Sequence, residues 1–262
     1  MNTIFIFKHK DVPYSLPQNE LYHTLEVGTA CREQHPEAEY RDNSIADNIS
    51  KWNAVLAELT GQWWIWRNLG RAGESSGESR GEWIGQTQYR RILNFAPDTD
   101  FNSLGDVVAC KPLDFGGFTV EEQFSNCHSQ LYIKDMEAIL KIRYPEYAES
   151  WDKYLKNGHK IYYSNGFIMR TEDYCRYSEW LFDLITHLTD AWHCNTPEEV
   201  QEKVRRDIAE GKCNSGDGGR PYFYQGQAPA FLSERLLTLY LRHNYEGRIF
   251  EHPYALMENS GI

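Results

Sequence analysis

The sequence predicts an α/β protein with a mostly parallel sheet, and three observations lead to this class. A short, wholly apolar run at residues 4–7 is typical of a strand that is buried on both faces of a sheet. Strand-like segments then alternate with segments of helical period, as in a sheet flanked by helices. The 262 residues are 41% hydrophobic and 14% aromatic, with no repeat or linker. We therefore expect residues 1–262 to form a single domain.

The remaining elements follow in chain order. A helix is expected over residues 53–69, because Leu56, Leu59, Trp63 and Trp66 recur on one apolar stripe. Further strands are expected over residues 83–88, 106–110, 161–169 and 248–254, and further helices over residues 119–142, 171–188, 198–209 and 230–243. Two Gly-rich stretches without periodicity, residues 70–81 and 211–220, predict mobile loops of the kind that form active-site lids.

Charge and cysteine content exclude several classes of protein. The sum of 27 basic and 38 acidic residues gives a net charge of −11, whereas a nucleic-acid binder normally carries a basic surface. The six cysteines are scattered and form no Cys-x-x-Cys pair, which argues against a structural zinc site. No segment is long and apolar enough to span a membrane, so a cytoplasmic protein is expected, with at most peripheral contact at the inner membrane surface.

One acidic motif, Asp98-Thr99-Asp100, has the spacing of a metal-binding Asp-x-Asp. Two such carboxylates can hold Mg²⁺ or Mn²⁺ against a diphosphate. The preceding Asn94-Phe95-Ala96-Pro97 is typical of a loop rather than of a buried strand end. A solvated acidic turn is the favoured interpretation. Walker A, Rossmann glycine, nucleophile-elbow and His-Glu-x-x-His patterns do not occur in the sequence.

Charged side chains follow two of the predicted strands. His9-Lys10-Asp11 comes after the first strand, and Tyr89-Arg90-Arg91 comes after the strand at residues 83–88. Ligands of open α/β sheets bind at the carboxyl ends of the strands, and arginine binds phosphate in a bidentate manner. The pair Arg90 and Arg91 is therefore either a diphosphate site or an ion-paired sheet edge, and the spacing alone favours neither.

Glu234-Arg235 falls in the first turn of the helix expected from Ala230. The positive end of a helix favours an ionised carboxylate, and an ionised Glu in a cleft can act as a general base toward a hydroxyl. Acidic residues are also common in first helical turns without any function. On these residues alone, the interpretation without a function is favoured.

Several segments taken together resemble a known family over nearly the whole chain. They are His9-Lys10-Asp11-Val12-Pro13, Val27-Gly28-Thr29-Ala30, Asp47-Asn48-Ile49-Ser50, Glu58-Leu59-Thr60, Trp64-Ile65-Trp66-Arg67-Asn68, Tyr89-Arg90-Arg91, Asn165-Gly166-Phe167-Ile168-Met169 and Phe231-Leu232-Ser233-Glu234-Arg235-Leu236. The family comprises bacterial capsular, exopolysaccharide and O-antigen glycosyltransferases, long described as a domain of unknown function. The sequence departs from it at Gln88, where the family usually has His.

The resemblance implies a GT-A-like, Rossmann-related sheet that binds a nucleotide-sugar, most simply a UDP-sugar. It implies transfer of a hexose to a surface polysaccharide or a lipid-linked precursor, with inversion. The donor would lie near His9, Lys10, Asp11, Asp47, Asn48 and Gln88, and the sugar or acceptor near His128, Asn165 and Arg235.

The resemblance also assigns chemical roles. Arg90 and Arg91 occupy the place where many GT-A enzymes keep a metal-binding Asp-x-Asp, which favours a metal-independent reaction over one with Mn²⁺ or Mg²⁺. Glu234 has the position of the general base. The alternative is a binding protein for carbohydrate or nucleotide-sugar that keeps the fold without catalysis, an interpretation favoured by Gln88 and by the missing strand-end Asp-x-Asp.

Overall fold

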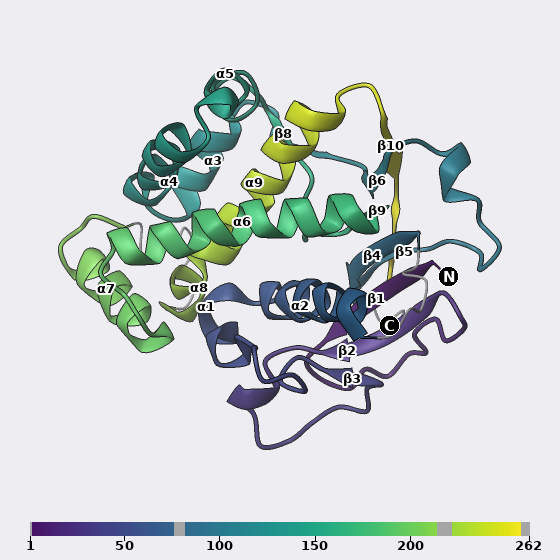
Figure 1. Ribbon diagram of the computed structural model, residues 1–262. Coiled ribbons are helices and arrows are strands. Elements are labelled where there is room, and N and C mark those ends of the chain that lie inside the picture. Colours follow the sequence, from purple (N-terminus) through teal and green to yellow (C-terminus); the bar gives the residue numbers. More distant parts are fainter. Residues whose placement is uncertain (1, 76–81, 214–221, 258–262) are drawn as a thin grey trace.

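The structure is a computed structural model that describes residues 2–75, 82–213 and 222–257 (Figure 1). Its main sheet has the strand order β10-β6-β9-β4-β1-β2-β3, with β5 and β11 added beside β4. A second small sheet pairs β7 with β8. The strands are β1 (Thr3–Lys8), β2 (Tyr22–Glu26), β3 (Tyr40–Arg41), β4 (Trp83–Gln88), β5 (Arg91–Leu93), β6 (Val107–Cys110), β7 (Leu113–Asp114), β8 (Lys160–Ile161), β9 (Phe167–Arg170), β10 (Ile249–His252) and β11 (Tyr254–Leu256).

The predicted fold class is confirmed by the directions of these strands. β1 is parallel to β2 and to β4, β2 is parallel to β3, and β6 is parallel to β10. β9 runs antiparallel between β4 and β6. The sheet is therefore mixed but mostly parallel, and the carboxyl ends of β1 and β4 lie at the same edge.

Helices flank this sheet (Figure 1). α2 and α6 contact each other and lie over the strands, while α3, α4, α5 and α9 form a group on the other side of α6. The helices are α1 (Asn53–Leu56), α2 (Leu59–Ser75), α3 (Val120–Cys127), α4 (Gln130–Arg143), α5 (Ala148–Trp151), α6 (Thr171–Ala191), α7 (Pro197–Ala209), α8 (Tyr222–Gly226) and α9 (Ala228–Tyr245).

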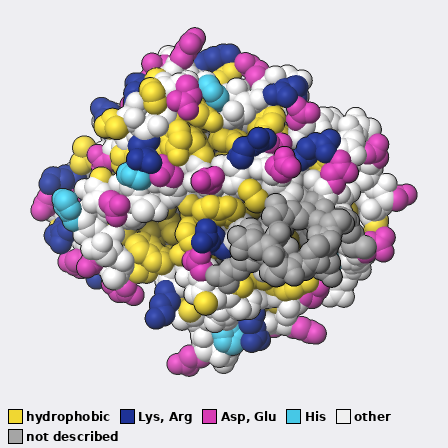
Figure 2. Space-filling model, in the orientation of Figure 1, with side chains coloured by type: hydrophobic (Ala, Val, Ile, Leu, Met, Phe, Trp, Pro, Cys, Tyr) yellow, Lys and Arg dark blue, Asp and Glu magenta, His cyan; other side chains and the backbone are white. Residues whose placement is uncertain are grey.

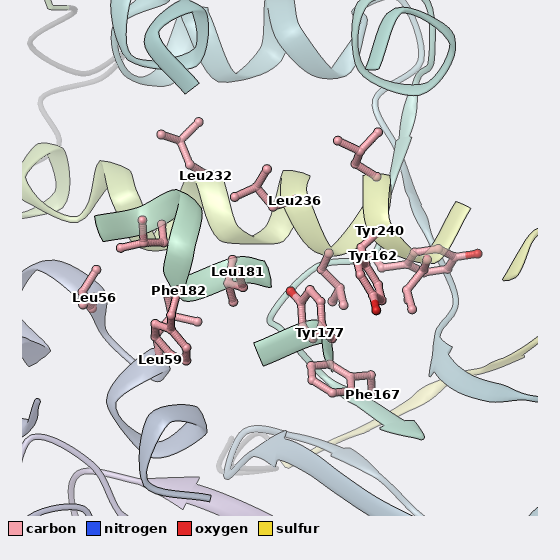
Figure 3. Packing of buried hydrophobic residues seen from close by; sticks show 14 of the residues in the cluster. Leu56, Leu59, Tyr162, Phe167, Tyr177, Leu181, Phe182, Leu232, Leu236 and Tyr240 are labelled. Carbon is pink, nitrogen blue, oxygen red and sulfur yellow. The ribbon is translucent and has the colours of Figure 1, made fainter. Parts of the chain in front are cut away.

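The packing of α9 against α6 fixes the rotation of α9 about its axis. Leu232, Leu236 and Tyr240 recur every four residues and belong to the same buried cluster as Leu181 and Tyr177 of α6 (Figure 3), and the centre of the Tyr240 ring lies 4.9 Å from that of the Tyr177 ring. Both leucines of α9 are fully buried, and burying one leucine stabilises a fold by about 1.5–3 kcal/mol. A residue two positions after Leu232 is rotated by about 200° around the helix. Glu234 therefore lies on a different side of α9 from Leu232, and its carboxylate reaches the turn before β9 at Ser164.

The bounds of several expected elements differ in the structure. The helix over residues 53–69 breaks at Ala57, whose φ of 46° separates α1 from α2. The prediction of one continuous strand over residues 161–169 was wrong. A turn with positive φ at Ser164 and Asn165 separates β8 from β9. The last helix begins at Ala228 rather than at Ala230. Glu234 therefore lies in the second helical turn, where the charge of the helix end is weaker.

The two expected loops are only partly described. Residues 70–75 continue α2 and do not form a loop, because each residue added to an existing helix gains one further backbone hydrogen bond. Residues 76–81 lie outside the described residues. Of the second loop, residues 211–213 form a turn after α7, in which the Lys212 amide donates to the Asp207 carbonyl at 2.7 Å. Residues 214–220 lie outside the described residues.

Candidate functional site

Two adjoining clefts open at the carboxyl ends of β1 and β4. The first, called the α9 cleft, has a volume of about 490 Å³ and lies between α9, α3 and the turn before β9. The residues that line it are Ala57, Glu58, Gln88, Arg91, Leu113, Phe115, Gln123, Cys127, His128, Ile161, Tyr163, Ser164, Tyr224, Gln227, Ala230, Phe231, Glu234 and Arg235. The β1 cleft, of about 430 Å³, is lined by Phe7, His9, Val27, Arg32, Asn53, Ala57, Glu58, Gln88, Tyr89, Arg90 and Gln227. Ala57, Glu58, Gln88 and Gln227 line both clefts, so a ligand can extend from one into the other.

Glu58 is placed between the clefts by the break between α1 and α2. The Asn53 side-chain amide donates to the Ala57 carbonyl at 2.7 Å and to the Thr60 hydroxyl at 3.3 Å, which holds the break. The Glu58 carbonyl then accepts the first amides of α2, at 3.0 Å from Gly61 and 3.3 Å from Gln62. The positive end of α2 is therefore close to the Glu58 carboxylate.

The turn before β9 is held by hydrogen bonds from β4. Gln86 donates to the Asn165 carbonyl at 2.8 Å, and Gln88 donates to the Ser164 carbonyl at 3.2 Å. Positive φ at two successive non-glycine residues, Ser164 and Asn165, is unfavourable. It is retained because both carbonyls are bound. The next residue, Gly166, has no room for a Cβ, which would lie 2.1 Å from the Tyr254 hydroxyl oxygen.

Asn165 lies under the α9 cleft and joins two of its walls. Its side-chain amide donates to Glu58 Oε1 at 2.9 Å and to the Ser233 hydroxyl at 2.9 Å. Its own side chain is 1% exposed. Asn165 therefore orients Glu58 and α9 from below rather than facing a ligand.

Glu234 lines the α9 cleft as a partly buried carboxylate. Its Oε1 accepts the Ser164 backbone N–H at 2.6 Å, and its Oε2 accepts from Arg235 Nη1 at 3.0 Å. Arg235 is buried, and it also donates to the Phe231 carbonyl at 3.0 Å and to the Gln123 side-chain oxygen. Each of these bonds restrains the carboxylate while one side of it remains at the cleft.

Glu58 and Glu234 influence each other electrostatically. Burial raises the pKa of Glu58 above its usual value, and the nearby charge of Glu234 raises it further, against hydrogen bonds from Asn165 and Gln88. Burial also raises the pKa of Glu234, and the charges of Arg235 and Arg91 offset part of that rise. Carboxyls with raised pKa values in a cleft are typical of catalytic acid–base groups.

The β1 cleft is cationic. Burial and the charges of Arg32, Arg90 and Lys10 lower the pKa of His9 to about 4, so this imidazole is neutral at pH 7. Arg32 is held by the Val27 carbonyl and by the Asn53 side-chain oxygen, the latter at 3.2 Å. A cleft with two guanidinium groups at a strand end suits an anion such as a phosphate.

Asp42 lies behind the wall of the β1 cleft and holds the backbone that follows Val27, a residue of that wall. Its buried carboxylate accepts the backbone N–H groups of Gly28 at 2.6 Å and Thr29 at 3.1 Å, as well as the Ser50 hydroxyl. Gly28 has a φ of 71°, and a Cβ there would lie 2.3 Å from the Asn53 side-chain oxygen. Ser50 therefore supports the turn after β2 instead of capping α1.

Arg90 and Arg91 face different clefts. The Arg90 guanidinium lies 5.2 Å from the centre of the Tyr89 ring, and the Arg91 guanidinium lies 5.7 Å from the centre of the Tyr163 ring. Among the described residues, no carboxylate is within ion-pairing distance of either arginine. The ion-paired sheet edge that the sequence left open is therefore not found in the described part of the chain.

Four residues of the predicted donor site lie away from both clefts. Lys10 is exposed, and Asp11 is exposed and pairs with Lys8 at 3.1 Å. Asp47 pairs with Arg67 at 2.6 Å. The Asn48 side chain closes a local turn by donating to the Ile45 carbonyl at 2.7 Å. Their predicted role in donor binding therefore has no support from their position.

His128 is at the far wall of the α9 cleft and is 1% exposed. Its ring stacks on Tyr224 with 5.3 Å between centres, and its Nδ1 is 3.2 Å from the Gln225 side-chain oxygen. Of the predicted residues, the structure thus brings Gln88, Arg91, His128, Glu234 and Arg235 to the α9 cleft. It brings His9, Arg90 and again Gln88 to the β1 cleft.

Glu58 and Arg32, which line these clefts, and Asp42, which lies behind the wall of the β1 cleft, were not predicted as site residues. Glu58 stands one residue after a break that helical periodicity does not reveal. Arg32 and Asp42 lie in segments without periodic pattern. The only signal in the sequence was the occurrence of Glu58 in the family motif Glu58-Leu59-Thr60.

Among residues 2–75, 82–213 and 222–257, no group of three or more His, Cys, Asp or Glu side chains is arranged to hold a metal ion. Asp100 instead caps a short helical turn by accepting the Asn102 amide at 3.1 Å. On the face drawn in Figure 2, basic and acidic side chains are interspersed around a hydrophobic centre.

Within the described part of the chain, none of the helices combines the length and the apolar character that crossing a membrane requires.

Comparison with known proteins identifies the fold. The structure is similar to that of the bifunctional glycosyltransferase WbbM in its apo form, with a TM-score of 0.71, 21% sequence identity and 98% of this chain covered. The chain therefore has the fold of a glycosyltransferase, with a mixed, mostly parallel sheet flanked by helices. It spans 45% of the WbbM chain, so the match concerns less than half of that protein.

The chain belongs to the family described as domain of unknown function DUF4422, whose model matches residues 3–211. None of the curated protein sequences matches this chain. The family match includes β1, the α1–α2 break, β4 and the turn before β9. It ends before α9, which carries Glu234.

Proposed function

We propose that the protein is a glycosyltransferase that moves a hexose from a nucleotide-sugar, most simply a UDP-sugar, to the hydroxyl of a saccharide acceptor. The observation that carries this proposal is the junction of the two clefts. A cationic cleft at the end of β1 adjoins a cleft that contains a restrained carboxylate. Donor and acceptor sites of a transfer reaction must meet in this way, so that the reacting atoms come within contact distance.

The nucleotide part of the donor is assigned to the β1 cleft. His9 is neutral and accepts or donates hydrogen bonds without adding charge, while Arg32 and Arg90 supply the positive charge at one wall. Arg91 lines the adjoining α9 cleft, and Gln88 lines both clefts. A diphosphate at the end of β4 would lie between the two arginines, which would stabilise the charge that develops when it leaves.

The chemical step follows from Glu234. Its carboxylate accepts the proton of the acceptor hydroxyl while the acceptor oxygen forms a bond to the anomeric carbon of the sugar. The bond between that carbon and the diphosphate oxygen breaks on the opposite face, and its electron pair leaves with the nucleoside diphosphate. One displacement of this kind inverts the configuration of the anomeric carbon.

The positive charge of Arg90 and Arg91 supports a metal-independent reaction. The charges lie where the leaving diphosphate is assigned, and stabilising this developing charge is the main requirement of the step. We further propose that the acceptor is a surface polysaccharide or its lipid-linked precursor. This places the enzyme in the cytoplasm, with peripheral contact at the inner membrane surface.

A second candidate function is binding of a nucleotide-sugar or carbohydrate without turnover. The observation that favours it is the contact between Glu234 and the buried Arg235, which lowers the basicity of the carboxylate. Gln88, in place of the histidine usual in the family, favours it as well.

A ligand screen followed by a turnover assay decides between the two functions. Nucleoside diphosphates and nucleotide-sugars that bind the native protein will raise its thermal midpoint. Release of nucleoside diphosphate from a bound donor, measured with and without Mn²⁺, supports the transferase. Binding without turnover across a panel of saccharide acceptors supports the second function, and the absence of any nucleotide binding contradicts both.

A further inference from the structure

The junction of the clefts has one charged group among the described residues. Of the four side chains that line both the α9 cleft and the β1 cleft, Ala57, Gln88 and Gln227 are neutral, and Glu58 is the fourth. If the nucleotide occupies the β1 cleft and the acceptor the α9 cleft, the transferred sugar lies at this junction. This step rests on the proposed function.

Glu58 is fixed in position but retains capacity for further hydrogen bonds. Its carboxylate accepts hydrogen bonds from Asn165, to Oε1 at 2.9 Å, and from Gln88, whereas a carboxylate has about four acceptor sites. The neighbouring Gln88 and Gln227 carry both donors and acceptors. Such a set matches the hydroxyl groups of a neutral sugar, which donate to the carboxylate and exchange bonds with the amides.

The positive charges around the junction are already engaged. Arg235 pairs with Glu234 at 3.0 Å, and Arg32 is held by Val27 and Asn53. Arg90 and Arg91 are assigned to the diphosphate, which itself brings negative charge. A carboxylate on the transferred sugar would therefore meet Glu58 and Glu234 without a cation of its own, and buried like charges repel strongly.

We propose that Glu58 is a specificity-determining residue that admits donors with a neutral glycosyl group and rejects donors whose glycosyl group is a uronic acid. Its carboxylate binds sugar hydroxyls at the junction of the clefts and repels a sugar carboxylate at the same place. The adjoining Glu234 adds to this repulsion.

Calorimetric titration tests this proposal with matched pairs of donors. UDP, UDP-glucose with UDP-glucuronate, and UDP-galactose with UDP-galacturonate are titrated into the wild-type protein and into the variants Glu58→Gln, Glu58→Asp and Glu149→Gln. Glu149 is an exposed residue of α5 and serves as the matched control. Circular dichroism melts establish that each variant is folded at the temperature of the titration.

For the wild type, we expect the acidic member of at least one pair to bind about tenfold or more weakly than its neutral partner. The discrimination persists in Glu58→Asp, which keeps the charge, and in Glu149→Gln. In Glu58→Gln it falls to less than about threefold. Failure of UDP itself to bind overturns the proposed function and this inference together. Binding of UDP with equal affinity for neutral and acidic sugars, or discrimination unchanged in Glu58→Gln, overturns the inference alone.

Discussion

Glu234→Gln is the substitution that separates catalysis from nucleotide binding. The amide is isosteric with the carboxylate but does not accept a proton from the acceptor hydroxyl. General-base catalysis contributes about 10²–10⁴-fold, or roughly 3–5 kcal/mol of activation free energy. Glu234 lines the α9 cleft and is absent from the lining of the β1 cleft. We therefore expect the transfer rate to fall by that factor, while the Kd for UDP changes by less than about twofold.

The structure also sets the effect of this substitution on stability. The amide oxygen still accepts the Ser164 N–H, and Arg235 keeps its bonds to Phe231 and Gln123. The substitution removes the ion pair between Glu234 and Arg235, but it also relieves the burial of a charged carboxylate, which is the larger of the two effects on the pKa of Glu234. The two effects oppose each other, so we expect the free energy of unfolding to change by less than about 2 kcal/mol. For a chain of this size, the thermal midpoint then moves by less than about 8 °C, and the variant remains folded in an assay at 25 °C.

The assay compares initial rates of product formation at saturating donor with UDP affinities from titration. Glu149→Gln provides the control for a change of charge at an exposed site. A transfer rate for Glu234→Gln within threefold of the wild-type rate would refute the role of Glu234 as base. A parallel loss of UDP affinity would show that the substitution disturbs the fold and not the chemical step.

Four further outcomes are expected. Arg90→Ala weakens UDP binding by about 1.5–3 kcal/mol, the size of a charged hydrogen bond, and equal affinity in titration would return Arg90 to a structural role. The transfer rate falls as the pH is lowered through the raised pKa of Glu234, because protonation removes the base. The acid limb of the pH–rate profile therefore lies above the usual pKa of 4.5. An acid limb below pH 4.5 contradicts the assignment of Glu234 as base. The pKa of the His9 ring, which is about 4, rises once UDP is bound, because the diphosphate offsets the positive charge of the neighbouring arginines. An NMR titration of the ring that UDP leaves unchanged would place the nucleotide elsewhere. Leu236→Ala lowers the free energy of unfolding, measured in urea, by about 2–5 kcal/mol. The control Ile142→Ala, at a side chain that is 81% exposed, changes it by less than about 0.5 kcal/mol. Equal effects of the two substitutions would contradict the packing of α9 on α6.

The raised pKa of Glu234 has opposite consequences for stability and for activity: as the pH rises through it, stability falls and activity increases. The pKa of Glu234 is higher in the folded protein than its usual value of 4.5. The stability that protonation of this carboxyl contributes is therefore fully present below pH 4.5 and is lost as the pH rises through the raised pKa. Activity requires the ionised form, so the base functions at a pH where its burial is unfavourable.

The fold was predictable from the sequence where a local pattern coincided with packing. Residues 4–7 are apolar because β1 is covered on both faces, and the stripe of Leu232, Leu236 and Tyr240 is buried in the core. The breaks were not predictable from hydropathy. Positive φ at Ser164 and Asn165 accompanies hydrogen bonds from Gln88 and Gln86, which are far away in the sequence. Positive φ at Ala57 accompanies a side-chain hydrogen bond from Asn53, which periodicity does not reveal.

The candidate site was predictable only in part for the same reason. Arg90, Arg91 and His9 follow strands, and the ends of strands can be recognised from hydropathy. Glu58 reaches the junction because Asn53 holds the break before α2, a contact within the fold that periodicity does not report. Asp47 and Asn48 were assigned to the donor through the resemblance, and the structure places them beside Arg67 and Ile45 instead.

The most direct test of the account is a transfer reaction in EDTA, with purified protein, a panel of UDP-hexoses and saccharide acceptors. The anomeric configuration of the product is read by NMR. The account predicts that transfer persists when divalent metal is removed and that the new glycosidic bond has the configuration opposite to that of the donor. A product with retained configuration, or transfer that occurs only when Mn²⁺ or Mg²⁺ is restored, would contradict it.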